Sequence, residues 1–214
     1  VMGEELVRAV EAEKATGLLA VRYPPLPPSF KTRHYFGTDS RGWDVLAQIY
    51  GGLQLVFQAA IIYLLVTYAI GITLGSLMGY LGGTFDIVVQ RFIEILANVP
   101  FLYVVIIIAD RIGREDVTLV TILLVLCIFS WIGITYYMRT AAYREKARDY
   151  VAAARVLGAG PIRVIFRHVL PNAISIVVTL LPFSVVGVIT ALTALDFIGF
   201  GLPDTYPSWG RILG

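Results

Sequence analysis

Long stretches without charge alternate along this chain with short stretches in which charged residues gather. Residues 45–85 contain no Asp, Glu, Lys or Arg, and neither do residues 117–138 and 169–195. Crossing the hydrocarbon layer of a membrane takes about 20 consecutive apolar residues in a helix. We therefore predict an all-α, polytopic transmembrane protein with at least four spans. The predicted spans are residues 53–80, 87–109, 117–138 and 169–195.

The second predicted span is the one that contains charged residues. Arg91 and Glu94 lie in its first third, near its inner end, and are three residues apart on one helix face. We interpret them as a plain interfacial ion pair, worth a few tenths of a kcal/mol; contact with the basic loop described below stays open. Pro100 in this span and Pro182 in the fourth predict kinks, because proline removes a helical hydrogen bond.

Composition supports a lipid environment. Hydrophobic residues make up 57% of the chain and charged residues 15%, whereas soluble domains carry about 25% charged residues. The single cysteine, Cys127, lies in an apolar run and is interpreted as a packing residue. No Cys/His spacing typical of a metal site is present, and His34 has no ligand-like neighbour. We expect no metal and no other cofactor.

Lys and Arg residues gather in the loop of residues 139–170, which carries seven of them. The connection at residues 110–116 has two, opposed by three acidic residues. Because loops rich in Lys and Arg stay in the cytoplasm, the 139–170 loop is predicted to be cytoplasmic. Residues 1–44 then form an extracytoplasmic segment, since long segments cross regardless of charge. Residues 45–214 form the membrane domain.

Four glycines in the first span recur at a spacing of four residues, which places them on one helix face. They are Gly71, Gly75, Gly79 and Gly83. Small residues on one face let another helix backbone approach closely. We predict a packing face, either for a helix of this chain or for a second subunit.

Two apolar stripes at helical spacing share the basic loop. The first consists of Tyr150, Ala153, Ala154 and Leu157, and the second of Ile162, Ile165, Phe166, Val169 and Leu170. Between them, Gly158 supplies a helix stop and the Gly160-Pro161 pair a helix start. The loop is predicted to be a compact helix–turn–helix with a small apolar tip and basic flanks.

Three interpretations of this loop compete. An amphipathic hairpin on the anionic inner leaflet is one, with membrane lipid as the partner. Nucleic-acid binding is disfavoured, because the arginines accompany an alanine-rich apolar tip without stacking aromatics. A knob that docks into a groove of a partner protein is the third. The small residues at the tip favour docking, and the surface hairpin stays open.

The same loop carries a spaced motif. Ala152, Ala153 and Ala154 are followed by three residues, then Gly158, then nine residues, then a His-Val-Leu-Pro run ending at Pro171. This resembles the permease subunits of ATP-binding-cassette importers, whose motif reads Glu-Ala-Ala, three residues, Gly, nine residues, Ile-x-Leu-Pro. The chain departs from it at Ala152 and His168, which leaves any specific salt bridge to an ATPase open.

What the resemblance implies is a coupling helix that seats in a cleft of an ATPase subunit. The residues it assigns to this role are Ala152, Ala153, Ala154, Leu157, Gly158, Ala159, Gly160, Pro161 and Pro171. It also implies the type I importer fold of six spans, so one span is expected before Val1 and one after Gly214. The implied partners are ABC ATPase subunits, a second permease subunit and an extracytoplasmic substrate-binding protein.

Two further segments refine the resemblance. Residues 36–46 and the outer stretch of residues 195–203 with 207–210 are similar to the dipeptide/oligopeptide permease branch, closest to importers of peptides and microcin C. The implied function is import of peptides or peptide-like compounds across a bacterial or archaeal inner membrane. An importer for nickel or another small solute is the alternative within the class.

A secondary transporter or channel is the rival class. Such proteins often place ionisable groups at mid-membrane, and no Asp, Glu, Lys, Arg or His falls near the centre of a predicted span. A phosphate-binding Gly-Lys-Ser/Thr loop is absent as well, so the chain does not bind ATP in that manner. We expect no enzymatic activity in the chain itself; the energy comes from a partner.

Overall fold

The computed structural model describes residues 25–30, 34–39, 42–113, 116–201 and 206–213. Much of the predicted extracytoplasmic segment therefore lies outside the described residues. So do Arg114 and Glu115 of the predicted outer connection, and residues 202–205 of the outer stretch near the C-terminus.

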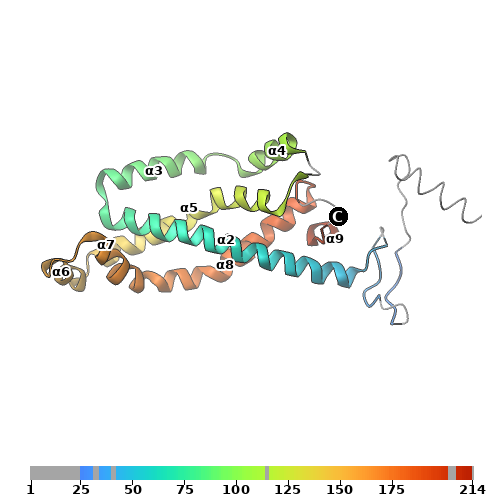
Figure 1. Cartoon of the computed structure of the whole chain (residues 1–214), viewed down its shortest axis with the longest axis horizontal. Helices are drawn as coiled ribbons and strands as arrows, with labels where there is room; N and C mark the ends of the chain where they lie inside the picture. Colours follow the sequence, from blue (N-terminus) through green and yellow to red (C-terminus); the bar gives the residue numbers. More distant parts are fainter. Residues whose placement is uncertain (1–24, 31–33, 40–41, 114–115, 202–205, 214) are drawn as a thin grey trace, which may run out of the picture.

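Three long helices lie lengthwise beside one another: α2 (Val45–Leu81), α5 (Leu119–Lys146) and α8 (Leu170–Phe197) (Figure 1). They contain the predicted span 53–80 and nearly all of 117–138 and 169–195. Helix α2, α5 and the run Pro161–Phe197 are each long and apolar enough to cross a membrane. The uncharged stretches have become helices because a backbone in lipid must satisfy its own hydrogen bonds.

The second predicted span, residues 87–109, is interrupted at Pro100, where the sequence predicts a kink. The structure has two helices there, α3 (Gly83–Ala97) and α4 (Phe101–Ile112), bent by 66° at the break between them. Pro100 has no N–H to donate and disfavours helical backbone at Val99. The Asn98 side chain then donates to the Glu94 carbonyl at 2.7 Å and closes the end of α3. Pro182, in contrast, lies inside an unbroken α8.

Three of the predicted packing glycines lie against α5 of the same chain. A Cβ atom placed on Gly71 would lie 2.7 Å from the Ile134 Cβ, and one on Gly75 would lie 2.5 Å from the Thr135 carbonyl oxygen. Gly79 faces the Arg139 carbonyl oxygen in the same way. The backbones of α2 and α5 are close because these side chains are absent.

Gly83 does not belong to this face. It follows the end of α2, has φ +61°, and a Cβ atom on it would meet nothing within 4 Å. The spacing of four continues through the sequence, but the helix ends at Leu81, so the face ends with it.

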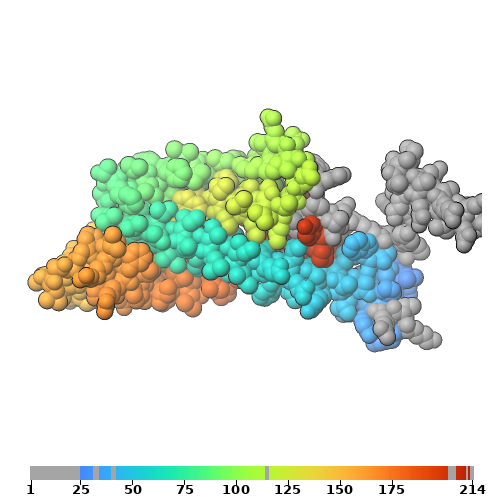
Figure 2. All heavy atoms as spheres, in the orientation of Figure 1, coloured from blue at the N-terminus to red at the C-terminus, as the bar shows by residue number. Residues whose placement is uncertain are grey.

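The two ends of the bundle differ. At one end α9 (Trp209–Leu213) packs on α8 and α2, and the Trp209 indole N–H donates to the Ile49 carbonyl at 3.0 Å. Asp44 begins α2 there by accepting from the Ala47 N–H at 3.0 Å. At the other end three short helices follow one another: α6 (Asp149–Val156), α7 (Pro161–Val164) and the π-helix η2 (Ile165–Val169). Figure 2 shows this group as the orange end of the molecule, projecting past the long helices.

Candidate functional site

Helices α6 and α7 with the turn between them form a knob, defined here as residues 149–164. The turn confirms the predicted helix–turn–helix. Gly158 has φ +81°, the Ala159 N–H donates to the Ala154 carbonyl at 3.0 Å, and the Gly158 N–H donates to the Arg155 carbonyl at 2.9 Å. This pair of bonds is a Schellman motif, which needs a left-handed residue and so favours glycine. Pro161 then begins α7 with its φ already helical.

The inner side of the knob is buried against the ends of α2 and α5. The cluster consists of Val151, Ala154, Val164, Ile165 and Val169 of the knob and η2 with Tyr80 and Ala142. Val151, Val164 and Val169 have no exposed surface. A stiff base of β-branched side chains therefore joins the knob to two of the long helices.

Tyr80 at the end of α2 is the polar anchor of this base. Its hydroxyl accepts a hydrogen bond from the Arg155 Nε at 3.1 Å, and the Arg155 guanidinium carbon lies 5.1 Å from its ring centre. The Lys146 Nζ lies 5.7 Å from the same ring. Cations at such distances from an aromatic face contribute about 0.5–1 kcal/mol when exposed. One aromatic ring thus links α2, α5 and α6.

The outer side of the knob is an apolar tip. Val156 and Leu157 are each 87% exposed and Ile162 is 70% exposed. The first predicted stripe is wrong here, because Leu157 follows the last residue of α6 and does not share a face with the buried Ala154. Packing against Tyr80 sets the helix phase, and it buries Val151 and Ala154, three residues apart.

The structure brings most of the predicted coupling residues to this tip or its sides. Exposed residues of the set are Ala152, Ala153, Leu157, Gly158, Gly160, Pro161 and Pro171. Ala154 is buried and Ala159 is half-buried, so these two belong to the base. Pro171 is separate from the tip, at the second residue of α8.

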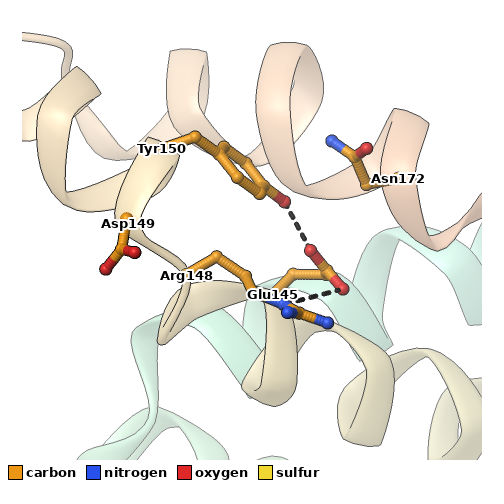
Figure 3. Close-up of a pocket in the computed structure, with 5 residues that line it drawn as sticks. All are labelled: Glu145, Arg148, Asp149, Tyr150 and Asn172. Atoms are coloured by element: carbon orange, nitrogen blue, oxygen red, sulfur yellow. Dashed lines mark hydrogen bonds and ion pairs between the residues drawn. The ribbon is translucent and has the colours of Figure 1, made fainter.

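A polar joint lies where the knob meets the long helices (Figure 3). Glu145 lies in the last turn of α5, and Tyr150 and Asn172 lie in the first turns of α6 and α8. With Arg148 and Asp149 they line an open hollow of about 440 Å³. The Tyr150 hydroxyl donates to the Glu145 Oε2 at 2.5 Å, while the Arg148 Nε lies 3.9 Å from the Oε1. Glu145 therefore holds the start of the knob to α5 through a tyrosine and an arginine.

This joint changes the acidity of Tyr150. Burial, and next the hydrogen bond to the Glu145 carboxylate, raise the pKa of Tyr150 to about 12. A carboxylate that accepts from a phenol favours the protonated phenol. The hydroxyl consequently stays a donor to Glu145 across the physiological pH range.

The π-helix η2 links the knob to α8 without a break. Its widened turn is closed by the Leu170 N–H, which donates to the Ile165 carbonyl, and it ends two residues before Pro171. A proline cannot donate a hydrogen bond and crowds the carbonyl four residues earlier, which here is that of Arg167 in η2. The Asn172 side chain also donates to the His168 carbonyl at 2.6 Å. The motif's proline therefore shapes the connection from knob to span.

Sequence reasoning missed Tyr80, Glu145 and Val156 as parts of the site. It also placed Ile162 on one stripe with Ile165, whereas Ile162 is exposed at the tip and Ile165 is buried. Glu145 carried a signal, because it is the single acidic residue between Asp116 and Asp149. Tyr80 carried none, since its partner Arg155 lies 75 positions away.

Residues 71–214 match the family described as the binding-protein-dependent transport system inner membrane component. The chain belongs to this family. Its membership confirms the predicted permease class and the all-α importer permease fold, and it favours that class over a secondary transporter or channel.

The similar proteins are named as subunits of transport systems. The chain is 39% identical over 180 residues to the peptidoglycan transport system permease protein YejE of Agrobacterium fabrum, covering 84% of the chain and 46% of that protein. It is 37% identical over 189 residues to the inner membrane ABC transporter permease protein YejE of Escherichia coli, covering 88% and 54%.

A third relative is named as a dipeptide permease. The chain is 32% identical over 185 residues to the dipeptide transport system permease protein DppC of Bacillus subtilis, covering 86% of the chain and 56% of that protein. The chain thus spans about half the length of the curated relatives it matches.

Proposed function

We propose that this chain is the membrane subunit of an ATP-driven importer for peptides or peptide-like compounds. ATPase subunits supply the energy at the knob, a second permease subunit completes the pathway, and an extracytoplasmic binding protein delivers the substrate. Family membership and relatives that are named as peptide permeases support this assignment. The chain itself has no phosphate-binding loop for ATP.

The observation that carries the proposal is the contrast between the two sides of the knob. The side chains of Val151 and Val164 have no exposed surface, whereas Val156 and Leu157 are 87% exposed at the tip. Apolar side chains that protrude together from a rigid base are typical of a protein contact. An ATPase cleft that covers them would be held by apolar contact, which needs no glutamate at Ala152.

The base explains how motion at the tip would reach the membrane. Val151 packs with Tyr80 of α2 and Ala142 of α5, Glu145 holds Tyr150, and η2 continues into α8. Movement of the tip by a closing ATPase pair therefore moves the inner ends of all three long helices together. The spans then alternate between inward-facing and outward-facing arrangements.

Leu157→Asp tests this function, with Leu157→Met as the matched control. Leu157 contributes little to the packing of the chain, so the protein is expected to insert and accumulate normally. A charge at the tip is expected to lower co-purification of the ATPase and peptide uptake at least tenfold, while the methionine variant keeps both. Unchanged uptake and ATPase binding in Leu157→Asp would exclude the knob as the docking element.

A further inference from the structure

One face of α3 carries polar side chains along its whole length. Asp86, Gln90, Glu94 and Asn98 follow one another at a spacing of four residues, which puts them on a single helix face. The Gln90 amide donates to the Glu94 carboxylate at 3.2 Å and to the Tyr136 hydroxyl at 3.3 Å. The Arg91 guanidinium lies beside this face, 2.6 Å from the Glu94 Oε2.

The Arg91–Glu94 pair flanks Ile93, through which α3 contacts the middle of α5. Ile93 is fully buried against Met78 of α2 and Trp131, which is near the middle of α5. Asp86, which pairs with Arg139 at the inner end of α5, is eight residues before Glu94. At 1.5 Å per residue this is about 12 Å, in a hydrocarbon layer about 30 Å thick.

The described residues of the chain also leave the pair uncovered. The Arg91 side chain is 74% exposed and the Glu94 side chain 40%. Charged side chains inside a membrane face the bundle interior or a water-filled cavity, because exposure to lipid is costly. The exposed Phe92 is two residues before Glu94 and so lies on the opposite side of α3, whereas Val88 and Ile95 lie next to Arg91 at spacings of three and four. Glu94 therefore faces away from Phe92, and Arg91 lies between the polar face and the apolar side of the helix.

We propose that this polar face of α3 lines the water-filled substrate path, and that Arg91 and Glu94 bind the charged ends of a zwitterionic peptide. The inference rests on the proposed function. Arg91 would take the substrate carboxylate, which matches its planar guanidinium, and Glu94 would take the ammonium group. With no substrate present the two side chains neutralise each other. Asn98 extends the face to the break before Pro100.

The pair suits a passing substrate for an energetic reason. An exposed ion pair at i and i+3 is weak, so a peptide separates it at little cost. A transport path needs binding that is favourable enough for entry and weak enough for release. A buried, fully satisfied pair would not meet this condition.

The experiment measures access of a water-soluble, membrane-impermeant thiol reagent in membranes that contain the whole transporter. Cys127 is first replaced by alanine, and Glu94→Cys or Asn98→Cys is added; Phe92→Cys on the opposite side of α3 is the matched control. We expect both polar-face cysteines to react with the charged reagent during turnover. Transported peptide is expected to slow their reaction at least threefold, while the control stays unreactive.

Each outcome decides the proposal. Unreactive cysteines at both polar-face positions, or equal reaction at Phe92→Cys, would show a lipid or subunit contact and overturn it. Reaction that peptide does not slow would overturn substrate binding. The two cysteine positions keep the test valid if one variant fails to accumulate. Failure of the proposed function itself is separate, because the Cys127→Ala parent would then take up no peptide.

A charge series provides the second measurement. Arg91→Gln is expected to lower peptide uptake at least tenfold while the ATPase activity stimulated by the loaded binding protein is retained, and Arg91→Lys is expected to recover part of the uptake. Equal loss in the glutamine and lysine variants together with loss of stimulation would indicate a structural role and contradict binding by charge.

Discussion

At the residue scale, the contact between α2 and α5 depends on the absence of three side chains. The sequence predicts a packing face at Gly71, Gly75 and Gly79, because their spacing matches the helix period. The sequence does not predict which helix packs against this face, since the contacting residues Thr135 and Met138 lie some 60 positions away along the chain. Gly83 shows the limit of such patterns, because spacing alone does not reveal where a helix ends.

Gly75→Ala is expected to destabilise the protein. Its Cβ would lie 2.5 Å from the Thr135 carbonyl oxygen and 2.8 Å from the Met138 Cβ, so α2 and α5 must separate. Overpacking of this kind costs about 1–3 kcal/mol. Gly133→Ala is the control, because a Cβ there meets nothing within 4 Å. Thermal unfolding in detergent measures the difference, and equal melting temperatures for the two variants would refute the close contact.

Glu145→Gln is expected to lower the pKa of Tyr150, which is about 12 in the native protein. Burial still raises it, but the carboxylate that favours the protonated phenol is gone. Because the folded pKa lies above the unfolded value of 10.0, the contribution of Tyr150 to stability is full below that value. It is lost as the pH rises from there through the folded pKa.

Tyrosinate absorbance during a pH titration checks this prediction. The difference between the native protein and a Tyr150→Phe variant isolates the one residue from the other tyrosines. The same difference in the Glu145→Gln background is expected to titrate at lower pH. An unchanged midpoint would mean that the hydrogen bond to Glu145 does not hold the phenol protonated.

At the element scale, the long helices could be predicted because a backbone in lipid must form all of its hydrogen bonds internally. A stretch such as residues 117–138 without charge has few alternatives to a transmembrane helix. A kink at Pro100 could be predicted but a full break between α3 and α4 could not, since proline inside a membrane helix is compatible with either a continuous helix or an interruption. Pro182 in α8 and Pro100 before α4 show both results in one chain.

In the knob, the turn is set by its own residues, but the buried face of α6 is set by other helices. Gly158, Gly160 and Pro161 specify the turn through their own backbone preferences, so the helix–turn–helix could be predicted. Which face of α6 is buried depends on Tyr80 and Ala142, which belong to other helices. For this reason the predicted stripe placed Leu157 with Ala154, although Leu157 is exposed at the tip.

Pro100→Ala is expected to reduce the bend between α3 and α4, which is 66° in the native protein. The restored N–H and the relief of Val99 let the helix continue through residues 98–100. Spin labels at the exposed positions Val88 and Ile107 report the distance between the two helices, which is expected to increase. Pro182→Ala is the control and is expected to leave that distance unchanged. An unaltered distance in Pro100→Ala would assign the break to packing and not to the proline.

At the scale of the whole molecule, an apolar contact and an ion pair join α3 to the long helices. Ile93 packs with Met78 and Trp131, and the Arg139 guanidinium contacts the Asp86 carboxylate through two hydrogen bonds, each of 2.6 Å. The Asp86 side chain is 17% exposed and that of Arg139 36%. A bidentate, half-buried pair therefore fixes the inner end of α3 to α5, close to the base of the knob.

This ion pair is expected to couple the position of α3 to the motion of the knob. Asp86→Asn leaves Arg139 half-buried without its carboxylate, and we expect a loss of about 1–3 kcal/mol of unfolding free energy, below the cost at a fully buried pair. Arg139→Gln is expected to cost a similar amount, and the double variant less than the sum, because the second change removes the unpaired partner. Additive losses would show that the two groups act independently. If the pair also transmits motion, each single variant loses peptide uptake while the loaded binding protein still stimulates ATP hydrolysis, since the tip at Leu157 is untouched.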